Sequence, residues 1–427
     1  MMRWFWFLSF LFVNGITTVF CFGLPLSEKQ LSDTVFNKVY EPGLRSVQLN
    51  IAEKDFSDPV ISLGGDQKLE LRFDDLSATR RNLGYTLVHC SAEWIPSDSD
   101  PIEYLSGTGR GLIREVSSSF NTTYDYTHYR LLFPEEDGIP LVSGNYAIKV
   151  YDEENPDKII LSRRFYITEE TARIEASVKQ PGFGEARETS HQVSFRVWHN
   201  NEIRDPVREL TAVVFQNNRS DRRLILGKPY TVQTGMVSYD DPETGIIAGG
   251  NEFRSLDIKN TRYQTQNLSA ITFQNPYYHA FMKPDEERGS KAYFSHTDLN
   301  GNYYIDREKS DDRHTESDYI YVHFNLSAPL LYTDDKVYVT GDFIDWQHDE
   351  SNQMIFNEST GNYELIMLMK QGLYDYCFYK SGGGSEKANE LELEGSFYET
   401  ENDYGIFIYF HDQYKGYDRL VGHLSIK

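Results

Sequence analysis

The chain has 427 residues, of which 42 are Lys or Arg and 65 are Asp or Glu, so its formal net charge at pH 7 is −23. This acidity excludes nucleic acid as the partner, because proteins that bind nucleic acids neutralise phosphates with Lys and Arg. The length predicts two to four domains, and a hydrophobic content of 39% is enough for a core in each, which excludes a disordered acidic chain. Aromatic residues make up 14% of the chain, a content typical of β-sandwich and binding-surface proteins.

The first 23 residues have the pattern of an export signal. Residues 1–3 form a short basic region, and residues 4–12 are apolar except for Ser9. That run is too short to span a membrane, and no later segment approaches the necessary length. We therefore expect removal of the signal peptide after Cys21 or after Gly23, and an exported, soluble protein without a membrane span. Lipidation of Cys21 stays open, although Phe20 stands where a lipoprotein signal requires Gly or Ala.

The segment from residue 24 to residue 168 predicts an N-terminal β-sandwich of the immunoglobulin-like type. Short alternating or apolar runs are separated by turn residues, and none has a convincing helical period. A series of strands with this length and spacing is typical of such sandwiches. The expected strands are residues 46–51, 68–73, 85–90, 126–133, 145–151 and 159–167.

Two further β-rich domains are expected, a middle domain over residues 169–318 and a C-terminal sandwich over residues 319–427. The sequence thus predicts an all-β fold of tandem sandwiches. The middle domain includes Asp298-Leu-Asn-Gly-Asn-Tyr-Tyr-Ile-Asp306, which resembles a calcium loop but has Gly301 at the fourth position rather than the sixth. We interpret Asn300-Gly301 as a hairpin turn. The expected strands are residues 172–178, 192–197, 210–216, 252–258, 268–273, 319–324, 336–340, 363–368, 374–379 and 404–410.

No catalytic, cofactor or metal site is predicted. The sequence lacks the Gly-x-Ser-x-Gly, phosphate-loop, His-Glu-x-x-His and Cys-x-x-Cys patterns. Cys90 and Cys377 lie far apart and are expected to be two buried thiols rather than a disulfide framework. His89 precedes Cys90 directly, but adjacent strand residues point to opposite faces and cannot easily share one metal. We therefore expect a protein that is not an enzyme.

Five Asn-x-Ser/Thr sequences start at Asn121, Asn218, Asn267, Asn325 and Asn357. In a secreted eukaryotic protein they would be glycan acceptors, whereas in a bacterial one they would be polar residues of turns and strands. The second interpretation is favoured, because Asn121 belongs to a motif of the bacterial family described below.

Val337-Tyr-Val-Thr-Gly-Asp-Phe-Ile-Asp-Trp346, followed by Gln371-Gly-Leu-Tyr-Asp-Tyr-Cys-Phe-Tyr379, resembles the early-set immunoglobulin-like fold of glycogen- and starch-binding modules. The resemblance implies an early-set-like C-terminal sandwich. In those modules the residue at the position of Trp346 can stack on sugar. The second sugar-stacking Trp is missing here, because Ser381-Gly-Gly-Gly-Ser385 stands in its place. An exported carbohydrate-binding protein that uses Trp346 as a sugar platform is therefore the alternative function, and a structural role is favoured for this residue.

A longer set of motifs, in order along the chain, resembles the type IX secretion system plug proteins, a family formerly catalogued as a domain of unknown function. These motifs are Tyr40-Glu-Pro-Gly-Leu-Arg-Ser-Val-Gln-Leu49, Pro59-Val-Ile-Ser-Leu-Gly64, Leu71-Arg-Phe-Asp-Asp-Leu76, Tyr85-Thr-Leu-Val-His-Cys-Ser-Ala-Glu-Trp94, Ser119-Phe-Asn-Thr-Thr-Tyr-Asp-Tyr-Thr-His-Tyr129, Ser143-Gly-Asn-Tyr146, Asp298-Leu-Asn-Gly-Asn-Tyr303 and Leu368-Met-Lys-Gln-Gly-Leu-Tyr374. They extend over nearly all of the chain that follows the signal.

The resemblance implies a periplasmic protein of a Gram-negative bacterium that associates with the large outer-membrane β-barrel translocon and closes its periplasmic opening. It implies no catalytic residues and a monomeric subunit of a larger complex. It does not say which residues form the interface, or whether the plug stays bound during secretion. We hypothesise that Asn275-Pro-Tyr-Tyr278 makes adaptable contacts with the partner, because Tyr- and Asn-rich loops serve this purpose in other interfaces.

Overall fold

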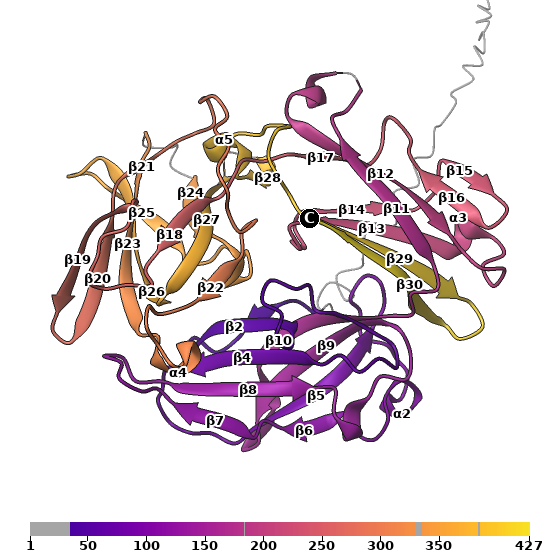
Figure 1. Ribbon diagram of the computed structural model, residues 1–427, viewed down its shortest axis with the longest axis horizontal. Helices are drawn as coiled ribbons and strands as arrows, with labels where there is room; N and C mark the ends of the chain where they lie inside the picture. Colours follow the sequence, from indigo (N-terminus) through magenta and orange to yellow (C-terminus); the bar gives the residue numbers. More distant parts are fainter. Residues whose placement is uncertain (1–34, 183, 330–334, 383–384) are drawn as a thin grey trace, which may run out of the picture. The chain divides into compact units, whose positions relative to one another are not determined.

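The computed structural model describes residues 35–182, 184–329, 335–382 and 385–427, which confirm the predicted all-β fold of sandwiches (Figure 1). The export signal and Cys21 lie outside these residues. The described helices are short turns, and none is long and apolar enough to cross a membrane. They are α2 (Pro101–Tyr104), α3 (Pro206–Glu209), α4 (Arg313–Glu316) and α5 (Leu391–Glu394), with 3-10 turns η1 (Glu136–Gly138), η2 (Glu185–Arg187) and η3 (Asp342–Ile344).

The first sandwich packs two sheets face to face, and their strands are antiparallel except for the parallel pair β3 and β10. One has the order β1-β10-β9-β5-β6, with the short β3 beside β10, and the other has the order β2-β4-β8-β7. Leu69, Leu71 and Phe73 alternate along β4 and point into the shared core, as the period of two requires. The strands are β1 (Lys38–Val39), β2 (Leu44–Ile51), β3 (Val60–Ser62), β4 (Leu69–Asp75), β5 (Leu83–Cys90), β6 (Arg110–Leu112), β7 (Glu115–Ser118), β8 (Thr127–Phe133), β9 (Gly144–Asp152) and β10 (Asn155–Thr168).

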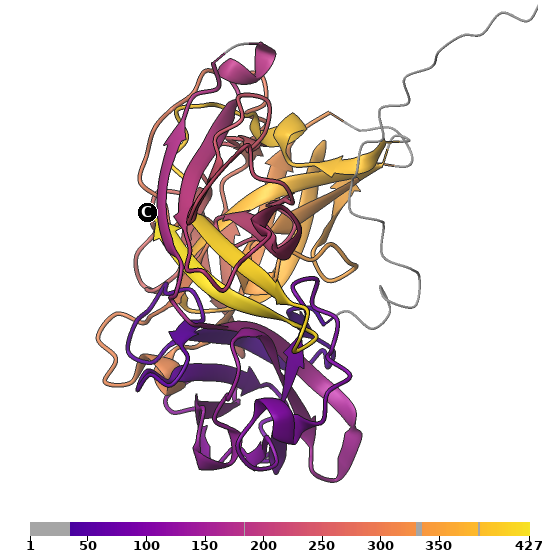
Figure 2. The same ribbon diagram turned by 90° about the vertical axis from the view of Figure 1, so that its right-hand side faces the viewer.

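The second sandwich combines strands from two distant parts of the chain. One sheet has the order β11-β12-β16-β15 with β17 beside β12, and the other has the order β14-β13-β29-β30. In Figures 1 and 2 the yellow hairpin β29–β30 accordingly lies among magenta strands. The strands are β11 (Arg173–Lys179), β12 (Ser190–Trp198), β13 (Leu210–Gln216), β14 (Arg223–Leu226), β15 (Thr231–Gln233), β16 (Met236–Tyr239), β17 (Ile246–Ala248), β29 (Tyr404–Asp412) and β30 (Tyr417–Ile426).

The third sandwich is formed by one long sheet whose strands surround a single core. Its order is β18-β27-β24-β25-β26-β23-β20-β19, with β21 beside β23 and with β22 and β28 beside β27. Leu256 on β18 and Leu268 on β19, near opposite ends of this order, belong to the same buried cluster. The strands are β18 (Arg254–Asp257), β19 (Leu268–Gln274), β20 (Tyr277–Met282), β21 (Asp285–Glu286), β22 (Tyr303–Ile305), β23 (Tyr319–Ser327), β24 (Lys336–Thr340), β25 (Gln353–Asn357), β26 (Asn362–Lys370), β27 (Gly372–Gly382) and β28 (Ser385–Asn389).

The strand pairing does not follow the boundary predicted between residues 318 and 319. β18 and β20 precede that point but pair with β27 and β23, whereas β29 follows it and pairs with β13. β13 is a central strand whose two edges both need backbone partners, and its second neighbour, β29, comes from the far end of the chain. We propose that the third sandwich is an insertion between β17 and β29 of the second.

Aromatic side chains join the first sandwich to the second. Phe407 on β29 has its ring centroid 4.5 Å from that of Tyr166 on β10 and 5.3 Å from that of Phe215 on β13. The Tyr409 hydroxyl donates a hydrogen bond of 2.7 Å to Oδ1 of Asn145 on β9. These residues belong to one buried cluster with members from both sandwiches, so burial of apolar surface joins them.

A buried ion pair joins the first sandwich to the third. Lys370 on β26 places its Nζ 2.6 Å from Oδ2 of Asp74 on β4, and both side chains are 1% exposed. The same carboxylate accepts hydrogen bonds from the Tyr319 hydroxyl at 2.8 Å and from Nδ1 of His128 at 2.7 Å. Nearby, the Asp318 carboxylate accepts bonds from the backbone and hydroxyl of Thr123. The charged groups that the contact removes from water are thereby compensated by hydrogen bonds.

A second buried ion pair joins the second sandwich to the third. Nη2 of Arg219 lies 2.8 Å from the Glu390 carboxylate, and Arg222 binds the same carboxylate. Asp221 holds Arg219 from the other side at 2.6 Å. The described residues from 35 onward belong to one compact unit of the chain, and these contacts explain why.

We expect Phe407→Ala to lower the free energy of unfolding by about 3–5 kcal/mol, because truncation leaves a cavity between two sandwiches. Phe294→Ala, at a ring that is 76% exposed, is the control and should change the free energy by less than about 0.5 kcal/mol. Urea unfolding followed by tryptophan fluorescence measures both. Equal midpoints for the two variants would contradict the assigned role of Phe407.

We expect Lys370→Met to cost about 3–5 kcal/mol of folding free energy, because Asp74 would keep its charge in a buried site without its cation. Lys291→Met removes a surface pair with Glu286, where the lysine side chain is 50% exposed, and should lower the free energy of unfolding far less, because solvent screens the pair. Chemical unfolding of both variants gives the comparison. A loss at Lys370 no larger than at Lys291 would show that the buried pair does not join the sandwiches.

Candidate functional site

Trp346, the predicted sugar platform, has one ring face covered. The guanidinium carbon of Arg219 lies 3.8 Å from the indole ring centroid, and Arg219 is itself held by Glu390. At Gly301 a Cβ atom would lie only 2.7 Å from the indole, so that edge is also closely packed. The covered face of this ring contributes to the contact between the second and third sandwiches. The use of Trp346 as a sugar platform stays a prediction.

The two cysteines are buried free thiols, as predicted. Burial raises the pKa of Cys90 to about 12, so its thiol is not a nucleophile. His89 instead lies with Nδ1 2.6 Å from Oγ of Ser97 and contributes to the first sandwich. Within the described ranges, no group of three or more His, Cys, Asp or Glu side chains is placed to hold a metal ion.

In the loop that resembles a calcium site, the carboxylates accept hydrogen bonds from backbone N–H groups. Asn300 and Gly301 have φ values of 53° and 84°, and Asn302 N–H donates to the Leu299 carbonyl at 3.1 Å, which confirms a tight turn. The turn leads into β22 and pairs no strand before it, so it is not a hairpin. Oδ1 of Asp298 accepts a hydrogen bond from Asn300 N–H, and Oδ2 of Asp375 accepts bonds from Leu299 N–H and Gly301 N–H. These carboxylates fix the turn.

The Asn-x-Ser/Thr residues occupy turns and strands. Asn121 and Asn218 have positive φ, which Asn tolerates better than most residues. Nδ2 of Asn267 donates to the Ser255 carbonyl, and Nδ2 of Asn357 donates to the Glu364 carboxylate. Asn325 lies on β23. This arrangement agrees with the interpretation as polar turn and strand residues.

The segment Asn275 to Tyr278 connects β19 to β20, and its aromatic side chains already have partners. The Tyr277 ring lies 5.1 Å from that of Tyr124 in the first sandwich and 5.7 Å from that of Tyr321 on β23. Tyr278 lies 5.1 Å from Phe273, whose side chain is 54% exposed. The segment therefore stabilises a contact between two sandwiches, and its role toward a partner stays a prediction.

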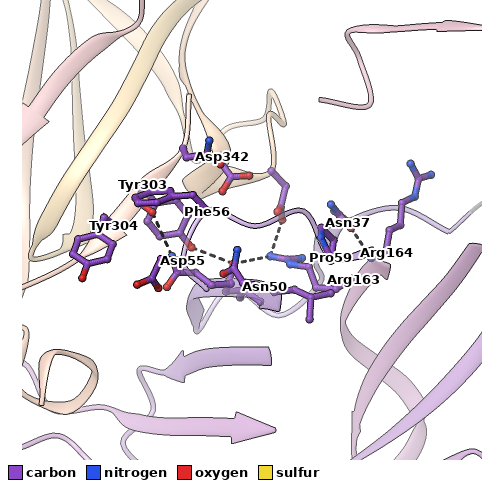
Figure 3. Close-up of a pocket in the computed structure, with 15 residues that line it drawn as sticks. Asn37, Asn50, Asp55, Phe56, Pro59, Arg163, Arg164, Tyr303, Tyr304 and Asp342 are labelled. Carbon is purple, nitrogen blue, oxygen red and sulfur yellow. Dashed lines mark hydrogen bonds and ion pairs between the residues drawn. The ribbon is translucent and has the colours of Figure 1, made fainter. Parts of the chain in front are cut away.

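A small polar cavity lies between the first and third sandwiches (Figure 3). Arg163 crosses it to Asp345, with Nη2 3.1 Å from Oδ2. Burial and the neighbouring Asp345 raise the pKa of Asp342 to about 7. The cavity volume of about 70 Å³ corresponds to about two water molecules at about 30 Å³ each. It is too small for an organic ligand.

A much larger groove opens between the same two sandwiches and is called here the β2–β26 groove. It has a volume of about 610 Å³, within the usual range of binding pockets, and it lies at a domain interface, where such pockets are common. One wall belongs to the first sandwich and the other to the third. The wall residues include Val39, Tyr40, Pro42, Arg45, Ser46 and Val47 on one side, and Phe343, Ile344, Asp349, Glu350, Ile366, Met367, Leu368 and Met369 on the other.

Several polar groups of the β2–β26 groove already have partners. Lys370 at its inner end is paired with Asp74, and desolvation lowers the pKa of this lysine. The Ser46 hydroxyl lies 2.9 Å from the Tyr319 hydroxyl, which in turn donates to Asp74. The side chains of Ile366, Leu368 and Tyr40 add apolar surface. The groove can therefore accept an apolar group or a polypeptide segment.

Sequence reasoning missed this groove, although its walls coincide with two motifs that carry the family resemblance. Tyr40 to Leu49 supplies one wall, and Leu368 to Tyr374 supplies part of the other. Nothing in the sequence indicated that these segments, more than 300 residues apart, lie opposite each other.

The stability of the folded protein should fall from about pH 4 to about pH 8 because of Asp375. Burial, together with the nearby Asp298 and Glu252, raises the pKa of Asp375 to about 8. A carboxyl with a raised folded pKa contributes stability that is fully present below its unfolded pKa of about 3.9 and is lost as the pH rises through about 8. Asp375→Asn should remove this contribution, so the urea midpoint of the variant should change less over this range. Parallel pH profiles for both proteins would contradict the assignment.

Comparison with known proteins agrees with the motifs. Residues 44–169 match the family model of the type 9 secretion system plug protein 1st domain. A hypothetical protein from Parabacteroides merdae, known from a crystal structure at 2.30 Å resolution, is 34% identical, with a TM-score of 0.87. That match covers 92% of this chain and 99% of the other, so the similarity extends over all three sandwiches. The comparison with curated proteins gave no match. This chain therefore belongs to the family of type IX secretion system plug proteins.

Proposed function

We propose that the protein is a non-enzymatic periplasmic plug, exported and freed of its signal peptide, that binds the outer-membrane barrel translocon of the type IX system and closes its periplasmic opening. Membership of the plug family supports this function. The observation that carries it is that each of the three sandwiches is joined to its neighbours by buried contacts, among them Lys370 with Asp74 and Arg219 with Glu390.

A plug must be a folded body that keeps its shape inside the pore. The lumen of a wide β-barrel conducts ions and solutes unless something folded fills it. Separate sandwiches on flexible linkers would move independently, because small interfaces between domains allow relative motion. Ion pairs and aromatic contacts that are fully buried between the sandwiches oppose this motion. Binding of such a body to the barrel needs surface complementarity and no chemistry.

Two experiments test the proposal. The tagged mature protein should capture the large barrel from detergent-solubilised envelopes, with mass spectrometry identifying it. The same protein, added to the purified barrel in a planar bilayer, should lower the conductance of the pore. Binding without a change in conductance would make the protein an accessory subunit and not a plug. Failure to capture the barrel would overturn the proposal.

The affinity for the barrel should fall as salt rises. The net charge of −23 predicts compensating Lys or Arg at the periplasmic mouth of the barrel. Screening shortens the range of such attraction from about 10 Å at 0.1 M salt to about 3 Å at 1 M. Binding measured at about 0.1 M and about 0.5 M NaCl should therefore differ severalfold, chiefly in the association rate. Equal affinities and rates would exclude electrostatic attraction.

A further inference from the structure

Strand β26 has an open backbone edge inside the β2–β26 groove. On one side it pairs with β23 along its whole length, from Leu326↔Tyr363 to Tyr319↔Lys370. On the other side β25 pairs only with its first residues and stops at Ile355↔Glu364. The strand segment from Leu365 to Lys370 therefore has a neighbour on one edge only, and its other edge faces the groove, which Ile366 to Lys370 line.

The register shows which backbone groups are open. Gln371 N–H donates to the Asp318 carbonyl at 2.8 Å, so residues 318 and 371 form a hydrogen-bonded pair. In an antiparallel ladder, hydrogen-bonded pairs alternate with pairs that are not hydrogen-bonded. The backbone N–H and C=O groups of Leu365, Met367 and Met369 therefore bond to β23. The N–H and C=O of Ile366 and Leu368 consequently point away from β23, and they have no hydrogen bond to any part of the chain that the structure describes.

This edge lacks the features that usually protect an edge strand. Residues 365–369 are Leu-Ile-Met-Leu-Met, without Pro or a charged side chain. The side chain of Ile366 is 57% exposed. β2 on the opposite wall shows the contrast, because its pairing with β4 is interrupted between Arg45 and Gln48, where Ser46 has a φ of 52°. Such a bulge protects an edge from pairing with another strand.

We propose that the β26 edge takes up an extended segment of the translocon barrel, which adds a strand to the third sandwich within the groove. The inference rests on the proposed function, because it names the part of the plug that receives the barrel. Strand addition draws its affinity from main-chain hydrogen bonds and its specificity from alternate side chains. Between Leu365 and Lys370 the edge is roughly 17 Å long at about 3.3 Å per residue, which suits a strand of five or six residues.

The chemistry of the occupant follows from the groove. Apolar side chains at alternate positions would contact Ile366, Leu368 and Tyr40. The rim carries Asp349 and Glu350, neither of which has an ion pair with a described residue, and Arg45, which donates to the Pro42 and Leu44 carbonyls. The other guanidinium of the lining, that of Arg163, is paired with Asp345. The surplus of carboxylates selects a segment with Lys or Arg beside its apolar residues.

Hydrogen exchange tests the proposal on the unmodified full chain. In the free protein the amides of Ile366 and Leu368 should exchange fast and those of Met367 and Met369 slowly, because only the latter are bonded to β23. With the solubilised barrel bound, Ile366 and Leu368 should exchange at least about tenfold more slowly. A bound barrel without this protection overturns the inference and leaves the proposed function intact, whereas absence of a complex overturns both. Protection that appears in concentrated protein alone would identify a second copy as the occupant and overturn the inference.

Two substitutions at one position separate the backbone from the side chain. Ile366→Pro removes the N–H that faces the groove, and proline is tolerated where the N–H is not needed by the sheet. Ile366→Thr keeps the N–H and β-branching and is the matched control. We expect the proline variant to bind the barrel at least about tenfold more weakly than the threonine variant, with equal thermal stability of the two. Equal binding by both variants would overturn strand addition.

Discussion

The arrangement of the chain depends on one buried charge pair, Lys370 with Asp74. Removal of two charges from water is costly, and the attraction between them compensates only when the remaining bonding capacity is also used. Here Tyr319 and His128 provide those bonds to Asp74, and the His314 carbonyl accepts from Lys370. Neither sandwich alone could bury its own member of the pair. The contact between the sandwiches therefore supplies the compensation, and the requirement selects a single relative orientation.

The β2–β26 groove is a consequence of this contact. Lys370 is the last residue of β26, so the ion pair holds that end of the strand against the first sandwich. The rest of the strand lies along a wall formed by Tyr40 to Val47, and the Arg163–Asp345 pair closes the far side of the contact. The groove is thus open where the two walls separate. The walls meet at the Lys370–Asp74 pair on one side and at the Arg163–Asp345 pair on the other.

The sequence predicted the elements better than their partners. Alternation at Leu69, Leu71 and Phe73 identifies a strand with one face in a core, and the structure confirms it. The same strand also carries Glu70 and Asp74 on its other face, which the alternation assigns to solvent and which is buried against the third sandwich. The alternation of apolar residues along a strand predicts which side chains lie in the core of one sandwich. It does not predict which side chains contact another sandwich. For the same reason Trp346 could be recognised as a conspicuous residue, whereas its cover, Arg219, could not be predicted.

The distance along the chain between β13 and β29, which pair in the second sandwich, has a consequence for how the chain reaches its native state. The hydroxyl of Tyr404 on β29 bonds to Gln216 on β13, 188 residues earlier, so the second sandwich has a high contact order. One edge of β13 pairs with the nearby β14, but its other edge stays without a partner until β29 is available. A strand edge that stays unpaired during folding is prone to aggregation, so the long separation between β13 and β29 makes the folding of the second sandwich the step most exposed to it.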